Sequence, residues 1–222
     1  DLSDQESLAE SHQIPIIYDG AHAFGVKHKG KSIFNYGTIS TCSFHATKIY
    51  HTIEGGAIIT KDAKLAEELR GIRSFGHKGD DYFAAGINGK NSEFHAAMGL
   101  VNLNHFDEIR SHRREASELY EQKLPTSIQF LSWNADNTRN YSYFPVLFSS
   151  EEVLLKVLKS LNSADIYPRR YFYPALNELP YLNYQSCPIA EDVARRIVCL
   201  PLSAEISSED IEQICSIISS TL

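Results

Sequence analysis

The sequence predicts an α/β protein in two parts: a partial α/β domain with a mainly parallel sheet over residues 1–108, and a small α+β domain over residues 109–222. Three observations support this prediction. Short apolar runs lie close together before residue 60, as strands of one sheet do. A long helical pattern spans residues 92–124, and after it the pattern changes to strand, strand and helix. The long helix is therefore expected to connect the two domains.

In the first part, helices alternate with strands. Ser3 and Glu6 form a capping box that opens a short helix. Strands are expected at residues 14–18, 39–44 and 57–59, and a hairpin at residues 27–32. The first strand is expected to be buried and ends at Asp19. Asp62 is expected to cap the next helix, which Gly76 ends.

In the second part, strands are expected at residues 128–131 and 141–148, and an aromatic-rich segment at residues 166–173. Ser150 is expected to cap a helix that runs to Leu161, and Pro188 to start one that runs to Val198. Ser207 caps the last helix, whose isoleucines recur at helical spacing.

Composition and charge exclude several functions. With 21 basic and 28 acidic side chains, the formal charge is -7, and no basic run is present, so nucleic acid is not expected as a partner. The four cysteines are scattered without metal-ligand spacing, which favours small buried side chains in a reducing compartment. No apolar run reaches 18 residues and the first residues do not resemble a leader. A cytoplasmic protein without a membrane span is predicted.

Four residues near the strand ends form the candidate site. Asp19 is placed at the carboxyl edge of the sheet, where α/β proteins bind ligands. Ser43 offers a hydroxyl to a phosphate, Lys48 follows five residues later, and His22 follows Asp19 by three. A carboxylate for a ring nitrogen, a hydroxyl for a phosphate and an amine for covalent attachment are what pyridoxal phosphate (PLP) requires.

Each of these residues also has a simpler interpretation. A strand-end aspartate such as Asp19 often caps a turn, and a loop lysine such as Lys48 is usually a solvated charge. Only the combination favours a cofactor site. His45 and His51 flank Lys48 without a third ligand, so no metal site is predicted, and His77 is expected to form a loop hydrogen bond.

Longer motifs carry a family resemblance. They are YDGAHAFG at residues 18–25, SFHATK at 43–48, EGGA at 54–57, GINGKNSEFHAA at 86–97 and LPL at 200–202. In this order they resemble the DegT-type nucleotide-sugar aminotransferases, which are fold-type I PLP enzymes that aminate keto-sugars carried on nucleotides. The resemblance implies that residues 1–108 are the C-terminal half of a large PLP-binding domain.

The resemblance also implies a role for each matching residue. Lys48 would hold the cofactor covalently and move a proton during transamination, and Asp19 would keep the pyridine nitrogen protonated. His22 stands where the family has a glutamine or histidine against the ring, and Ser43 matches a phosphate-binding serine. Asn88 matches an asparagine that reaches the phosphate from the neighbouring subunit, which implies a homodimer.

The substrates implied by the resemblance are glutamate as amino donor and a dTDP-4-keto-6-deoxyhexose as acceptor, for amino-sugar and polysaccharide biosynthesis; a 3-keto-sugar is the alternative. Arg169, Arg170, Tyr171 and Tyr173 fall where the small domain of the family approaches the sugar. An aromatic core strand with two exposed arginines explains the same residues equally well.

The sequence departs from the family at its start. The phosphate-gripping loop and the ring-stacking aromatic of the family are not found, so we expect an incomplete sheet, poor cofactor binding and no transaminase activity from these 222 residues alone. Relatives that dehydrate the sugar have a histidine in place of Lys48, so the lysine favours amination. A non-catalytic protein that keeps the scaffold is a rival, and a nucleotide-binding oxidoreductase lacks its G-x-G-x-x-G motif.

Overall fold

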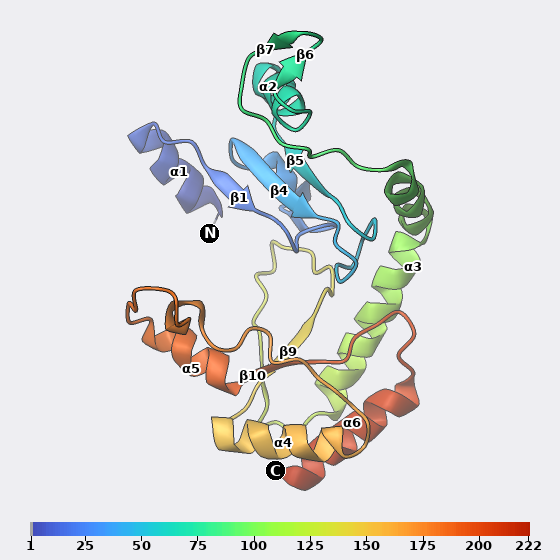
Figure 1. Ribbon diagram of the computed structural model, residues 1–222. Coiled ribbons are helices and arrows are strands. Elements are labelled where there is room, and N and C mark those ends of the chain that lie inside the picture. Colours follow the sequence, from blue (N-terminus) through green and yellow to red (C-terminus); the bar gives the residue numbers. More distant parts are fainter. Residues whose placement is uncertain (1) are drawn as a thin grey trace. The chain divides into compact units, whose positions relative to one another are not determined.

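The computed structural model describes residues 2–222, which divide into two compact units (Figure 1). The first unit is the chain up to Asp107 together with Asn134–Asn140. The second consists of Glu108–Trp133 and Tyr141–Leu222. The long helix α3 (Glu93–Lys123) contributes residues to both units. The second domain was predicted to run without interruption from residue 109, whereas the segment Asn134–Asn140 packs in the first unit.

The first unit is built on a three-stranded sheet in the order β1-β4-β5 (Figure 1). Its strands are β1 (Ile17–Asp19), β4 (Ile39–Ser43) and β5 (Gly56–Ile59). β1 pairs with β4 in parallel, and β4 pairs with β5 antiparallel. A mainly parallel sheet was predicted, whereas one of the two pairings among the described strands is parallel. The parallel pairing brings the carboxyl ends of β1 and β4 together.

Two helices, a 3-10 turn and two short hairpins complete this unit. They are α1 (Leu2–His12), α2 (Ala63–Ile72), η1 (Ile33–Asn35), and the pairs β2 (Lys27–His28) with β3 (Lys31–Ser32) and β6 (His77–Lys78) with β7 (Asp81–Tyr82). The Asp62 side chain accepts from the backbone N–H groups of Lys64 and Leu65, which confirms the predicted cap of α2. The predicted cap at Ser3 is wrong, because α1 already includes Leu2 and Ser3 lies inside it.

The first unit buries few large apolar side chains. β1 was predicted to be buried, but Ile17 is 66% exposed, because side chains of a strand project from the faces of the sheet and the described residues leave the Ile17 side uncovered. Ile58 on β5 and Phe94 and Leu100 on α3 are also exposed. The first unit therefore exposes several large apolar side chains on its sheet and on α3.

The second unit contains an antiparallel sheet in the order β10-β9-β8, of which Figure 1 labels β9 and β10. Its elements are β8 (Gln129–Phe130), β9 (Phe144–Leu147), α4 (Glu151–Asn162), η2 (Leu176–Glu178), α5 (Pro188–Arg196), β10 (Ile197–Leu200) and α6 (Ser208–Thr221). The caps predicted at Ser150 and Ser207 are confirmed. The helix predicted to reach Val198 ends at Arg196, because the apolar run that follows pairs with β9 instead.

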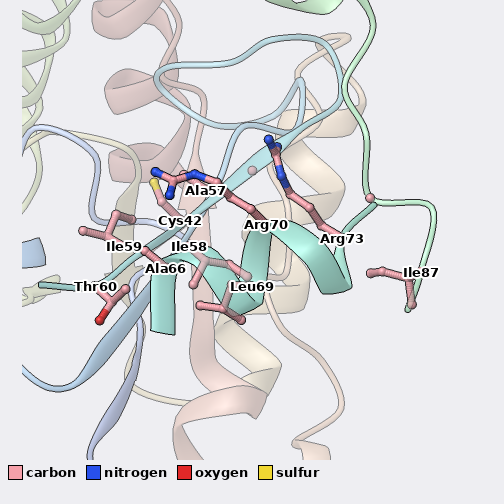
Figure 2. A pocket seen from close by; sticks show the side chains of 12 residues that line it. Cys42, Ala57, Ile58, Ile59, Thr60, Ala66, Leu69, Arg70, Arg73 and Ile87 are labelled. Carbon is pink, nitrogen blue, oxygen red and sulfur yellow. The ribbon is translucent and has the colours of Figure 1, made fainter. Parts of the chain in front are cut away.

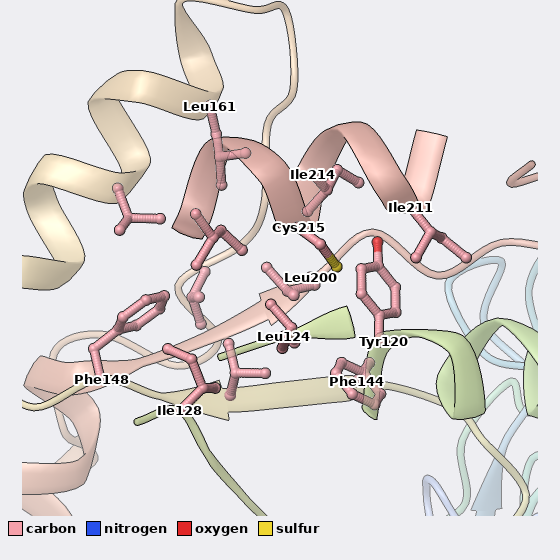
Figure 3. Close-up of a cluster of buried hydrophobic side chains, with 14 of the residues drawn as sticks. Tyr120, Leu124, Ile128, Phe144, Phe148, Leu161, Leu200, Ile211, Ile214 and Cys215 are labelled. Atoms are coloured by element: carbon pink, nitrogen blue, oxygen red, sulfur yellow. The ribbon is translucent and has the colours of Figure 1, made fainter. Parts of the chain in front are cut away.

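One hydrophobic cluster holds the second unit together (Figure 3). The helices α4 and α6 pack on each other, and Leu154, Leu161 and Ile218 are fully buried where they do so. Tyr120 of α3 stacks on Phe144 of β9 with ring centroids 4.8 Å apart. This unit therefore has a core of its own, whereas the first unit has none of comparable size among the residues described. No helix within residues 2–222 is long and apolar enough to span a membrane.

Candidate active site

The candidate site lies at the carboxyl ends of β1 and β4. Asp19 is the last residue of β1 and pairs in register with Thr41, two residues before Ser43 at the end of β4. The backbone N–H of Gly20 donates to the Thr41 carbonyl at 2.9 Å, which holds the two ends together after the strand pairing stops. The predicted position of Asp19 and Ser43 at one edge of the sheet is therefore what the parallel pairing produces.

Lys48 and His22 meet at this edge. The Lys48 Nζ lies 3.0 Å from the His22 Nε2. A lysine ammonium only donates hydrogen bonds, so Nε2 accepts and the imidazole proton lies on Nδ1. Lys48 is half-buried, on the turn that follows β4, and His22 is more exposed, on the turn that follows β1. Two residues 26 positions apart are thus joined by a direct contact.

The electrostatics of the pair favour a neutral imidazole. Burial lowers the pKa of His22 below its ordinary value, and the positive charge of Lys48 lowers it further, while Asp19 acts in the opposite direction. On β4, burial raises the pKa of the Cys42 thiol to about 11, although the charge of Lys48 opposes that rise. Cys42 therefore stays a neutral thiol at pH 7, and His22 remains a hydrogen-bond acceptor.

Asp19 and Ser43 each also stabilise their own turn. Asp19 Oδ1 accepts from the backbone N–H of Ala21 at 3.0 Å, and Ser43 Oγ accepts from the N–H of His45 at 3.3 Å. The turn-capping interpretation of Asp19 is therefore correct for one of its carboxylate oxygens. Since Ser43 accepts in this contact, its hydroxyl proton can be donated to an anion.

Asn140 is the residue of the site that sequence reasoning missed. Its side-chain Nδ2 donates to the carbonyls of His22 at 2.8 Å and of Phe24 at 2.9 Å, and the residue is only 6% exposed. These bonds fix the turn that carries His22. Asn140 lies 118 positions from His22, in the segment Asn134–Asn140, and nothing in its local sequence distinguishes it from other loop asparagines.

Aromatic side chains pack around Phe24 in the same turn. Phe24 stacks on Tyr50 at a centroid distance of 4.1 Å and meets Phe106 edge to face at 5.0 Å. Gly25 has a φ of +79°, and a Cβ there would lie 2.5 Å from the Phe106 ring. The glycine of this motif is therefore needed both for its backbone conformation and for the close approach of the ring.

The other predicted residues of the first unit lie elsewhere. Asn88 follows β7 and forms an isolated bridge with Ser74, beyond the end of α2, whereas Lys48 contacts His22. His45 contacts the hydroxyl of Thr47, and no cluster of metal-ligating side chains is found among residues 2–222. The hydrogen bond predicted for His77 is confirmed, because its Nδ1 lies 2.8 Å from the Gly79 carbonyl.

The four residues predicted to bind substrate belong to the second unit. Arg170 donates to the Glu151 carboxylate at 2.7 Å and to the Arg195 carbonyl at 2.9 Å. Its guanidinium also lies over the Tyr173 ring, 3.6 Å from the centroid. Arg170 is therefore committed to contacts within the unit. Arg169 is more exposed, and its guanidinium lies 5.4 Å from the ring centroid of Tyr171.

A pocket lies on another part of the first unit (Figure 2). It has a volume of about 660 Å³ and lies between β5 and α2. Apolar side chains such as Ile58 and Leu69 line it, together with Arg70 and Arg73. Cys42 lines it as well, and side chains alternate along a strand, so Ser43 faces the opposite side of the sheet. None of the predicted site residues lines this pocket. The candidate active site is therefore the edge of the sheet that carries Asp19, His22, Ser43 and Lys48.

Comparison with solved structures defines the class of fold. The chain matches the aminotransferase TlmJ from Streptoalloteichus hindustanus with a TM-score of 0.90 and 26% identity, over 97% of this chain and 60% of that one. It matches DesI, solved in the presence of its TDP-sugar product, with a TM-score of 0.89 and 29% identity, over 98% of this chain and 58% of that one. The predicted α/β aminotransferase fold of type I is confirmed.

The family follows from the sequence comparison. Residues 1–219 match the DegT/DnrJ/EryC1/StrS aminotransferase family, and the chain belongs to it, as the motifs predicted. A dTDP-4-amino-4,6-dideoxy-D-glucose transaminase of Shigella dysenteriae is 37% identical over 95% of this chain and 60% of that protein. A GDP-perosamine synthase of Escherichia coli O157:H7 is 31% identical over 97% of this chain and 60% of that protein. The chain thus spans about 60% of the length of these relatives.

Proposed function

We propose that the chain carries the reactive lysine of a PLP-dependent aminotransferase that acts on nucleotide-linked keto-sugars. The observation that carries the proposal is the contact of Lys48 with His22 at the ends of two adjacent parallel strands that also bear Asp19 and Ser43. An amine, a carboxylate and a hydroxyl are thus carried on one edge of the sheet, each of the type that one part of PLP needs.

The donor set fits the cofactor group by group. The Asp19 carboxylate would pair with the ring nitrogen, the Ser43 hydroxyl would donate to the phosphate, and Lys48 would attach the cofactor through Nζ. When bound, PLP supplies an electron sink for the carbon that gains or loses the amino group. Lys48 would then hold and move a proton at Nζ, and His22 would lie against the cofactor ring.

We propose glutamate as the amino donor and a dTDP-4-keto-6-deoxyhexose as the acceptor, which would yield the 4-amino sugar for polysaccharide or other amino-sugar biosynthesis. Support comes from the Shigella relative and from a second transaminase of the same name in Escherichia coli, 33% identical over 98% of this chain. Arg169, Tyr171 and Tyr173 remain proposed substrate contacts. Arg170 would act there indirectly, since Glu151 and the Tyr173 ring hold its guanidinium in place.

We also propose a cytoplasmic homodimer in which Asn88 reaches the phosphate bound by the other subunit. All four cysteines are free, as is usual in a reducing compartment. Asn88 is exposed, and so are Ile87 next to it in the sequence and Phe94 at the start of α3, which are 64% and 86% exposed. Sedimentation of the chain should give twice its mass, and Phe94→Glu should give the monomer; a monomeric parent chain at micromolar concentration would contradict the dimer.

A transamination assay tests the proposed activity. The chain is joined after the part of the Shigella relative that it does not match, and is given PLP, glutamate and a dTDP- or GDP-linked 4-keto-6-deoxyhexose. We expect a glutamate-dependent product with the mass of the dTDP-linked amino sugar. Lys48→Met should abolish product formation, whereas Lys64→Met, at an exposed position of α2, should not change it. Equal product from both variants would refute the role of Lys48.

A further inference from the structure

We infer that His22 is a positioning residue for Lys48: its neutral imidazole accepts a hydrogen bond from the Lys48 amine and holds that amine at the strand ends, and protonation of His22 releases it. The inference rests on the proposed function, because the held amine is the one expected to attach the cofactor.

The backbone of His22 is held by residues other than Lys48. Asn140 holds the carbonyls of His22 and Phe24, and the Ala23 N–H donates to the Gly20 carbonyl at 2.9 Å within the same turn. The Asn140 side chain is buried, so these bonds are protected from water. These bonds fix the backbone from which the imidazole projects, and the hydrogen bond to the imidazole removes rotamer freedom that a half-exposed lysine would otherwise keep.

Charge makes the contact depend on pH. The charges that shift the pKa of His22 are those of Lys48, on the turn after β4, and Asp19, at the end of β1; Lys48 also acts on the pKa of Cys42 on β4. Burial and the charge of Lys48 lower the pKa of His22, so the imidazole is neutral at pH 7. Once protonated, it has two donors and no acceptor, and it repels the ammonium. The hydrogen bond is then lost, while Asp19 limits the repulsion.

The first test measures the contact without any cofactor. The pKa of His22 is followed by NMR titration of its ring C–H signal, assigned with His22→Gln, in the parent chain, Lys48→Met and Lys64→Met. We expect a His22 pKa that is below its ordinary value in the parent, rises in Lys48→Met because a neighbouring cation is removed, and is unchanged in Lys64→Met. The same His22 pKa in all three proteins would overturn the inference.

The second test measures positioning. The protein joined to the unmatched part of the Shigella relative, and its His22→Phe and His22→Gln variants, are each treated with PLP, reduced with borohydride and digested, and the ratio of labelled Lys48 to labelled Lys64 is measured by mass spectrometry. We expect a severalfold lower ratio in His22→Phe, which has no acceptor, and recovery in His22→Gln, whose amide oxygen can accept. Equal ratios in all three would overturn the inference.

The two tests separate this inference from the proposed function. If the His22 pKa rises in Lys48→Met but PLP does not label Lys48 in the protein joined to the unmatched part of the Shigella relative, the contact stands and the proposed function fails. If PLP labels Lys48 while the His22 pKa is the same in the parent and in Lys48→Met, the proposed function stands and His22 has no positioning role.

Discussion

Replacing Asn140 with alanine should loosen the turn that carries His22. The change removes two buried hydrogen bonds, of 2.8 and 2.9 Å, to the carbonyls of His22 and Phe24. Each such bond contributes about 0.5–1.5 kcal/mol, so the turn should lose about 1–3 kcal/mol of local stability. Since 1.4 kcal/mol is a factor of ten in an equilibrium constant, the opening equilibrium should increase about 5- to 150-fold.

Amide hydrogen exchange followed by mass spectrometry measures this opening directly. Peptides that cover the turn after β1 should exchange faster in Asn140→Ala by that factor, and peptides from α4 in the second unit should not change. The matched control is Asn104→Ala, which removes an exposed asparagine from α3. If both variants exchanged alike at this turn, the positioning role of Asn140 would be refuted.

Three further predictions concern the second unit, with the free energy of unfolding measured in urea. Leu154→Ala should lower the free energy of unfolding by about 2–5 kcal/mol, because Leu154 is fully buried. Leu155→Ala on the same helix should lower it by less than about 1 kcal/mol, because Leu155 is 50% exposed. Equal losses of stability would contradict the described core. Tyr120→Phe should cost about 1–3 kcal/mol, because the Pro201 carbonyl loses its 3.0 Å donor, and an unchanged stability would count against that bond. Hydrogen bonds, the strongest from the backbone N–H of Cys187, lower the pKa of Glu191 in the folded protein. The ionised Glu191 therefore stabilises the fold above its unfolded pKa of about 4.3, and this stabilisation is lost as the pH falls through the folded pKa. Glu191→Gln should therefore flatten the acid dependence of stability, and an unchanged slope would exclude this role.

Local patterns predicted much of the fold. Side-chain caps at Asp62, Ser150 and Ser207 are short-range features, and all three helix starts were correct. The run at residues 197–200 was assigned in part to a helix, because a short apolar run fits a buried strand or a buried helix equally well. Its pairing with β9, some fifty residues away in the chain, decides between them and cannot be read locally.

The candidate site was predictable only where it lies on sequence motifs. Asp19, His22, Ser43 and Lys48 stand in two such motifs, and parallel pairing of β1 and β4 brings them to one edge. Asn140 escaped prediction because its partners are backbone carbonyls more than a hundred positions away, which constrain no local pattern. The engagement of Arg170 by Glu151 was hidden for the same reason, since the ion pair depends on the packing of the second unit.

The most direct test of the central claim is to find which lysine takes up PLP. The chain joined after the part of the Shigella relative that it does not match is incubated with PLP, reduced with borohydride and mapped by mass spectrometry, with its Lys48→Met and Lys64→Met variants treated in parallel. We predict that the modified peptide of the parent contains Lys48, that Lys48→Met loses this modification and that Lys64→Met keeps it. Labelling spread over the exposed lysines, with no preference for Lys48, would contradict the account.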